Sequence, residues 1–119
     1  MHKRQMVVFI LAYAAAMQAP ADKPVVGAAD VPKVFSYEDY PEEAVRNHWQ
    51  GDVVVGVTVT AEGLPTACEI VRSSGHQILD DATCKIVMRR ARFKPGTDAN
   101  GRPVADHIIL PPIRWRMSG

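Results

Sequence analysis

The sequence lacks an excess of either charge. Its 119 residues contain 14 Lys and Arg against 13 Asp and Glu, which gives a formal net charge of only +1. Because nucleic-acid-binding domains usually concentrate basic residues on one face, this balance argues against that class of function. The composition, 47% hydrophobic and 23% charged, is that of an ordinary globular chain long enough for one small domain.

The sequence also lacks an apolar run of the roughly 20 residues that a membrane-spanning helix needs. The longest such run covers residues 6–17 and follows a basic start with Lys3 and Arg4. Ala19 and Ala21 then have the small-residue spacing of a cleavage site, so residues 1–21 are typical of a secretory signal peptide. The alternative is a short uncleaved N-terminal anchor, and both interpretations predict an exported chain.

Cysteine is scarce, and the two that occur must be assigned either to chemistry or to structure. Cys84 ends a segment that also holds His76, Asp80 and Asp81. On one helix, His76 and Cys84 would lie about 12 Å apart along the axis, too far for a Cys–His nucleophile. Asp80 and Cys84 share a helix face but match no common zinc site, which usually has four ligands. We therefore predict no metal, no cofactor and no catalytic residues here.

A structural interpretation explains the same segment. Ser73–Gly75 can form a turn that caps a helix, and acidic side chains suit the positive N-terminus of that helix. Cys68, on the preceding strand, is then the available partner for Cys84. Because export leads to an oxidising compartment, we predict a Cys68–Cys84 disulfide, and two buried free thiols are the alternative.

The hydrophobic pattern predicts an α+β domain. Alternating valines at 53–59 indicate a strand with one buried face, and the short turn at 61–65 predicts an antiparallel second strand. Helices are expected from Pro41 to about Gly51, and after the Ser73–Gly75 turn, with Asp80 and Asp81 in the first turn, to about Lys94. The last segment, Val104–Met117, contains Pro111 and Pro112, so it must be an edge or a bulged strand. The economical fold is a two-layer sandwich of order α-β-β-α-β, with two helices on one face of a three-stranded antiparallel sheet.

The expected organisation has three parts. Residues 1–21 are the signal peptide or short anchor, and residues 22–39 form a linker because Pro20–Asp39 contains three prolines and no sustained period. Residues 40–117 form the folded domain.

Across Tyr40–Met117, a series of short motifs resembles the C-terminal domain of the TonB energy-transducer family. The motifs are, in order, Tyr40-Pro41, Gly51 before the valine-rich strand, Gly63 in the turn, Ser73-Ser74-Gly75, Leu79-Asp80, Phe93-x-Pro95 and Gly101-x-Pro103. The resemblance implies a periplasmic domain that binds an extended segment at the N-terminus of an outer-membrane transporter. Binding would occur by addition of a strand to the sheet edge, in energy-coupled transport.

This resemblance also implies which residues contact the partner. They are Tyr40, Pro41, Val104, Asp106, Ile108, Leu110, Ile113 and Trp115. The expected partner is a transporter segment or another envelope protein, with a homodimer possible and no nucleic acid. Membrane association is expected only through residues 1–21, if they are retained.

Two alternatives remain open at this point. The linker is short and the apolar segment carries no Ser or His within it, so the chain could be an exported stand-alone module that transduces no force. An exported enzyme would have to use His48, His76 or His107, but the sequence shows no convergent polar groups around them. The basic run Arg89–Lys94 is interpreted as a solvated helix end.

Overall fold

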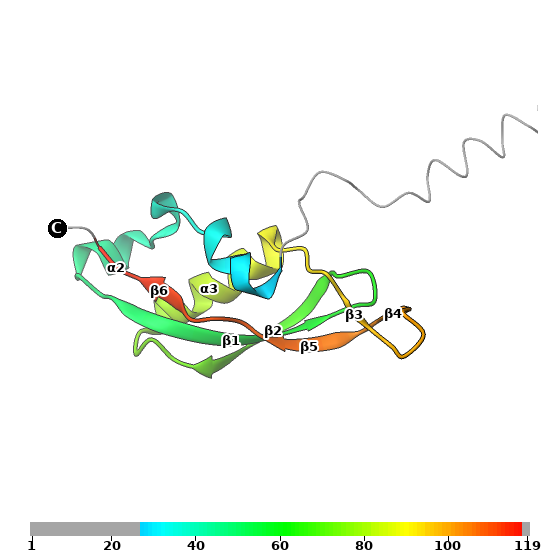
Figure 1. The fold of residues 1–119 in the computed structure, drawn as a ribbon. Coiled ribbons are helices and arrows are strands. Elements are labelled where there is room, and N and C mark those ends of the chain that lie inside the picture. Colours follow the sequence, from blue (N-terminus) through cyan, green and yellow to red (C-terminus); the bar gives the residue numbers. More distant parts are fainter. Residues whose placement is uncertain (1–26, 118–119) are drawn as a thin grey trace, which may run out of the picture.

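The structure, a computed structural model, describes residues 27–117 (Figure 1). From the N-terminus, its elements are the 3₁₀ helices η1 (Ala28–Val34) and η2 (Tyr37–Asp39), helix α2 (Glu42–Arg46), strands β1 (Gly51–Val59) and β2 (Pro65–Arg72), helix α3 (Gln77–Arg90), and strands β3 (Gly96–Thr97), β4 (Pro103–Val104), β5 (Asp106–Ile109) and β6 (Ile113–Trp115).

Strand β1 is the centre of the main sheet. It pairs with β2 on one side and with β5 and β6 on the other, and all pairings are antiparallel. The four valines of β1 at odd positions have no exposed surface, so they form the inner face, while Thr58 on the other face is exposed. The helices all lie on the inner side of the sheet (Figure 1), which confirms the predicted two-layer α+β architecture.

The prolines divide the final strand in two. Leu110 N–H donates to the Val55 carbonyl at 3.0 Å, and Ile113 lies opposite Val53. Pro111 and Pro112 therefore face the single residue Val54, which is the two-against-one arrangement of a β-bulge. The prediction that this segment must be an edge or a bulged strand is confirmed in both respects.

Helix α3 packs across β1 and β2 and is tied to the sheet covalently. The Cys68–Cys84 disulfide is present, with a Cα–Cα distance of 5.7 Å, as the sequence predicted. A link across this loop length stabilises a small domain by about 3 kcal/mol, mainly by restricting the unfolded chain. At the N-terminus of α3, the Asp80 carboxylate accepts hydrogen bonds from the Ser73 hydroxyl and from the backbone N–H and hydroxyl of Ser74.

Three expected elements differ in extent from the structure. The first helix ends at Arg46 rather than near Gly51, because His48 adopts a left-handed conformation (φ 55°) and Trp49 N–H bonds back to Ala44. Helix α3 ends at Arg90 rather than near Lys94. Val104 does not extend the main sheet; it lies in β4, which pairs with β3 in a separate two-stranded hairpin.

Part of the segment expected to be a linker is folded onto the domain. Val31 in η1 has no exposed surface and belongs to the hydrophobic core, and Phe35 packs edge-on against Trp115 with ring centroids 5.8 Å apart. Residues 28–39 are therefore continuous with the domain that was expected to begin at Tyr40. The physical reason is that a few apolar side chains suffice to dock a segment without any regular period.

Within residues 27–117, no helix has the length and apolar character required to cross a bilayer. The predicted signal peptide or anchor at 1–21 lies outside the described residues.

Candidate functional site

The edge formed by β5 and β6 exposes unpaired backbone groups. The odd-numbered residues of β1 bond to this segment, so alternation directs the N–H and C=O groups of Ile109 and Arg114 away from β1. His107 has the same orientation, but its N–H donates to Asp106 Oδ1 at 2.8 Å. In the described part of the chain, β5 and β6 have no strand partner besides β1. This edge is therefore able to accept another strand.

A groove lies beside β6 and has a volume of about 200 Å³. We call it the β6 groove. One wall is the β6 segment itself, and the other is the chain between η1 and η2, followed by Tyr40. It is lined by Pro32, Phe35, Ser36, Tyr37, Tyr40, Ile113, Arg114, Trp115 and Arg116. The groove thus places side-chain contacts next to the unpaired backbone of Arg114.

The floor of the β6 groove is aromatic and fixed to the core. Trp115 is buried, and its indole N–H donates to the Thr83 hydroxyl at 2.9 Å. Tyr40 packs edge-on against Trp115 with ring centroids 5.2 Å apart, and its hydroxyl donates to the Trp49 carbonyl. Burial raises the pKa of Tyr40 above its ordinary value of 10.0, so this hydroxyl remains a donor at neutral pH. These contacts make the floor rigid before any partner arrives.

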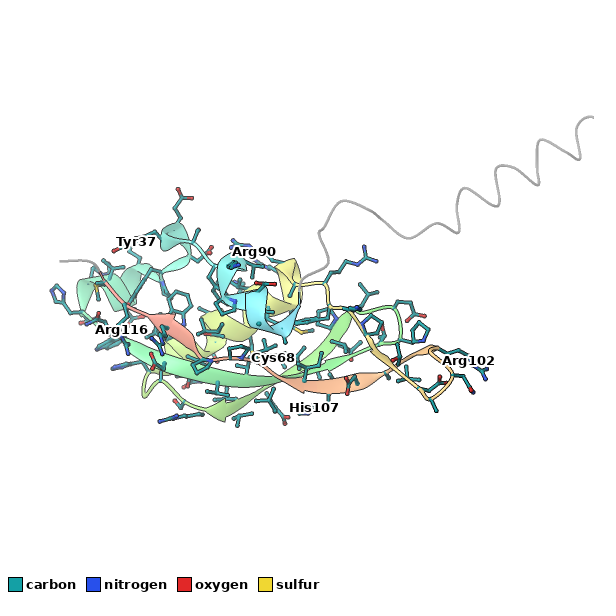
Figure 2. All side chains as sticks on the ribbon, viewed as in Figure 1. Tyr37, Cys68, Arg90, Arg102, His107 and Arg116 are labelled. Carbon is teal, nitrogen blue, oxygen red and sulfur yellow. A yellow bond between two sulfur atoms is a disulfide. The ribbon has the colours of Figure 1, made fainter. Side chains whose placement is uncertain are left out.

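A second hollow of about 500 Å³ adjoins the groove and shares Tyr37 and Tyr40 with it. We call it the Tyr37 hollow. Its lining is Tyr37, Glu38, Tyr40, Glu42, Val45 and Met117. Figure 2 shows Tyr37 and Arg116 at the same end of the molecule.

The two spaces differ in charge. Arg114 and Arg116 line the β6 groove, whose lining contains no carboxylate, whereas Glu38 and Glu42 line the Tyr37 hollow. Arg116 is already paired, with Nη2 at 2.8 Å from Asp52 Oδ1. A partner in this region therefore meets a basic stretch and then an apolar hollow with an acidic rim.

An ion pair holds the outer wall of the groove to α3. The guanidinium of Arg90 donates to both carboxylate oxygens of Asp39, at 2.6 and 2.7 Å, and also to the Val34 carbonyl at 3.3 Å. The Ser36 backbone N–H and hydroxyl donate to the same carboxylate. The hydrogen bond from Arg90 is the main cause of the lowered pKa of Asp39, which falls from 3.8 to about 2.

The residues predicted to contact a partner are only partly brought together. Tyr40, Ile113 and Trp115 line the β6 groove. Pro41 precedes α2 and lines a different depression, next to Arg89 and Arg90.

The remaining predicted contacts lie along β4, β5 and the bulge. Asp106 and Val104 are exposed, toward the opposite end of the final segment from β6, and Val104 is part of the hairpin with β3. Ile108 and Leu110 point to the inner face of the sheet, and Leu110 is fully packed in the core. At Leu110, Ile113 and Trp115 the side chains serve the core, so strand addition there would depend on the backbone.

Six groove residues were not predicted as site residues: Pro32, Phe35, Ser36, Tyr37, Arg114 and Arg116. The first four of them lie in the segment expected to be a linker. The pattern Ser36-x-x-Asp39 is a capping box, and the structure shows both of its reciprocal bonds. That pattern, between Phe35 and Tyr40, was the signal that could have indicated a folded segment before Tyr40.

The segment containing His76 and Cys84 has structural partners. The ring of His76 stacks on Trp49 with centroids 5.1 Å apart, Cys84 is in the disulfide, and Asp80 joins the start of α3 to the turn at Ser73 and Ser74. Burial raises the pKa of Asp80, but its hydrogen bonds from Ser73 and Ser74 outweigh this, and the net pKa is lowered. Within residues 27–117, no three His, Cys, Asp or Glu side chains are arranged to hold a metal ion.

Comparison with known proteins agrees with this geometry. Residues 36–117 match the family model described as the Gram-negative bacterial TonB protein C-terminal domain. The chain belongs to the TonB C-terminal domain family. The matched range begins at Ser36, inside the segment that forms the groove wall.

A curated relative and a solved structure support the family assignment and the fold. Protein tonB2 of Pseudomonas aeruginosa is 34% identical over 80 residues, which cover 67% of this chain and 28% of that protein. The NMR structure of the Helicobacter pylori TonB C-terminal domain has a TM-score of 0.54 and 21% identity, over 73% of this chain and 77% of the other, and it shows the fold alone. This TonB-family chain thus spans little more than a quarter of the curated relative that it matches. The family is non-enzymatic, as expected for this chain.

Proposed function

We propose that this chain is a periplasmic partner-binding domain that takes up an extended segment of an outer-membrane transporter by strand addition at the β5–β6 edge, in energy-coupled transport. The observation that carries the proposal is the unpaired edge of β6 beside a preformed groove, in a TonB-family domain. Main-chain hydrogen bonds would supply affinity, and the groove would select side chains.

The charges of the groove and the hollow define the partner further. An acidic side chain suits Arg114 and Arg116, and a bulky apolar side chain suits the hollow between Tyr37 and Val45. Because β6 runs from the groove toward Met117, a strand added along this edge would pass the β6 groove and the Tyr37 hollow in a fixed order. In one orientation, a partner strand therefore places its acidic side chain at Arg114 and Arg116 and its apolar side chain in the Tyr37 hollow. In the reverse orientation, its acidic side chain would lie against Glu38 and Glu42.

The test is a binding titration with synthetic peptides. The full-length chain, kept in mild detergent, is titrated with the N-terminal segments of the outer-membrane transporters of the same organism, and binding is followed by calorimetry. We expect at least one segment to bind and its scrambled version not to bind. The same segment with alternate backbone nitrogens methylated on its β6 side should also fail, since methylation removes ladder donors but keeps the side chains. Equal binding of the methylated peptide contradicts strand addition.

A charge swap tests the groove. In Arg114→Glu, a peptide with an acidic residue should bind about two- to fivefold more weakly, which is the range of an exposed ion pair. Replacing that acidic residue by lysine should restore affinity to the variant and lower it for the unmodified chain. Absence of this reciprocal pattern contradicts recognition of a carboxylate by Arg114.

A second candidate, a module of the same fold that transduces no force, is favoured by the short connection. Residues 18–27 number ten, so they span at most about 35 Å between the apolar segment and η1. N-terminal sequencing of the mature protein from membrane and soluble fractions separates the two candidates. A retained N-terminus in the membrane fraction supports energy coupling, and a cleaved one in the soluble fraction supports the stand-alone module.

A further inference from the structure

The segment that forms the outer wall of the β6 groove is held to α3 at two points, and both involve one side chain. Of the four residues between the two points, Phe35, Ser36 and Tyr37 line the groove and Glu38 lines the Tyr37 hollow. The points are the Val34 carbonyl and the Asp39 carboxylate, and the guanidinium of Arg90 donates to each. Arg90 is the last residue of α3, which is itself anchored in the core.

We propose that Arg90 is a positioning residue for partner binding: through Asp39 and Val34 it holds the 34–39 segment in place, so that the β6 groove exists before the partner arrives. The proposal rests on the function proposed above and concerns this chain's own side chains. We call the three contacts the Arg90 clasp.

The Arg90–Asp39 ion pair has a more restricted geometry, and a more buried carboxylate, than an ordinary surface ion pair. A guanidinium that contacts both oxygens of a carboxylate fixes orientation as well as distance. The Asp39 side chain is only 8% exposed, whereas that of Arg90 is 47% exposed, so the carboxylate is held inside and the arginine covers it. The same carboxylate also accepts both hydrogen bonds of Ser36, so that loss of Arg90 also loosens the cap of η2.

The remaining contacts of the segment do not replace the clasp. Val31 anchors η1 in the core upstream, and Phe35 rests on Trp115. Tyr37 lines both the groove and the hollow, and it is 64% exposed. Without Arg90, the stretch from Ser36 to Asp39 keeps fewer fixed points, so the wall should sample open arrangements while the core stays folded.

The expected effect follows from the fraction of molecules in which the wall is in place. The apparent Kd rises in inverse proportion to that fraction, so a wall in place for a tenth of the time gives a tenfold weaker Kd. For Arg90→Gln we expect peptide binding to weaken by about three- to tenfold. Arg90→Lys, which keeps the charge but loses the forked geometry, should fall between the wild type and Arg90→Gln.

The matched control is Arg102→Gln. Arg102 also pairs with an aspartate, Asp98, at 3.8 Å, but it lies in the β3–β4 turn. Figure 2 shows it at the opposite end of the molecule from Tyr37 and Arg116. Both variants remove one arginine and its ion pair, but the Arg102 pair is longer and more exposed and lies far from the groove.

Two readouts are taken on the full-length chain and its variants. Hydrogen–deuterium exchange measures protection in residues 28–39, β1 and α3, and calorimetry measures the Kd of the tightest transporter peptide from the panel above. We expect Arg90→Gln to lose protection in 28–39 but not in β1, and to bind more weakly, while Arg102→Gln changes neither. Asp39→Asn should reproduce the effect, since it leaves Arg90 in place and removes its partner charge.

The possible failures can be told apart. Unchanged exchange in residues 28–39 of Arg90→Gln overturns the clasp. Increased exchange with an unchanged Kd overturns its role in binding. Failure of the wild-type chain to bind any peptide of the panel contradicts the proposed function, and the positioning role falls with it, whereas wild-type binding that Arg90→Gln does not alter contradicts the positioning role alone.

Discussion

Trp115 shows how a single residue belongs to the core and to the candidate site at once. Its ring is 4% exposed and touches Phe35 and Tyr40, both of which line the β6 groove. Its indole N–H has a buried acceptor, the hydroxyl of Thr83 on α3, and that hydroxyl in turn donates to the Leu79 carbonyl at 2.8 Å. The floor of the groove is therefore fixed by a hydrogen bond from the sheet to the helix.

Thr83→Val tests this connection. Valine keeps the shape of threonine but removes the acceptor, so the indole N–H of Trp115 is left buried without a partner. We expect the free energy of unfolding to fall by about 1–3 kcal/mol, measured by urea unfolding followed by tryptophan fluorescence. Thr66→Val is the control, because Thr66 is exposed and its bond to the Thr58 carbonyl is long, at 3.3 Å. Equal losses in the two variants would contradict the role of the Thr83–Trp115 bond.

At the scale of elements, the turn between β1 and β2 packs against Phe93, which follows the C-terminal end of α3. Gly63 has φ of +84°, and its carbonyl accepts the Phe93 N–H at 2.8 Å. A Cβ atom at Gly63 would lie 1.9 Å from the Phe93 carbonyl oxygen. The turn therefore needs glycine for its backbone angle and for this close approach.

A comparison of two alanine variants separates the two requirements. Gly75 also has positive φ, +91°, but a Cβ there would meet no atom within 4 Å. We expect Gly75→Ala to cost about 1–2 kcal/mol from backbone strain alone. Gly63→Ala should cost about 3 kcal/mol or more, since the Phe93 backbone must also shift. Thermal unfolding measures both, and similar melting temperatures for the two variants would show that the contact with Phe93 contributes little.

Elements with a strong period could be predicted from the sequence, and elements held by isolated contacts could not. Alternating valines predicted a strand with one buried face, and the dipeptide Pro111-Pro112 predicted an edge or bulged strand. Both predictions are confirmed. The segment 28–39 has no period, and isolated contacts made by Val31, Phe35 and Asp39 join it to the domain. The candidate groove was missed for this reason, since its outer wall depends on a contact 51 residues apart in sequence.

At the scale of the whole molecule, α3 is held at both ends by carboxylates. Asp80 joins its N-terminus to the β2–α3 turn through Ser73 and Ser74, and Asp39 joins its C-terminus to the groove wall through Arg90. Both carboxyl groups have a lowered pKa in the folded chain. Acid should therefore loosen both ends of the helix together, and at the Asp39 end it should also loosen the outer wall of the groove.

The pH dependence of stability follows from the sign of these shifts. The pKa of Asp39 is about 2 in the folded chain, against 3.8 for the free group, so the unfolded chain binds the proton first as the pH falls. The contribution of Asp39 is complete above pH 4 and is lost as the pH falls toward 2. We expect urea unfolding between pH 6 and pH 2 to show a falling free energy of unfolding below pH 4. Asp39→Asn should be less stable than the wild type at pH 6 and should lose less stability on acidification, so that the two curves approach each other near pH 2. Parallel curves over the whole range would show that the Arg90–Asp39 pair contributes nothing to folding.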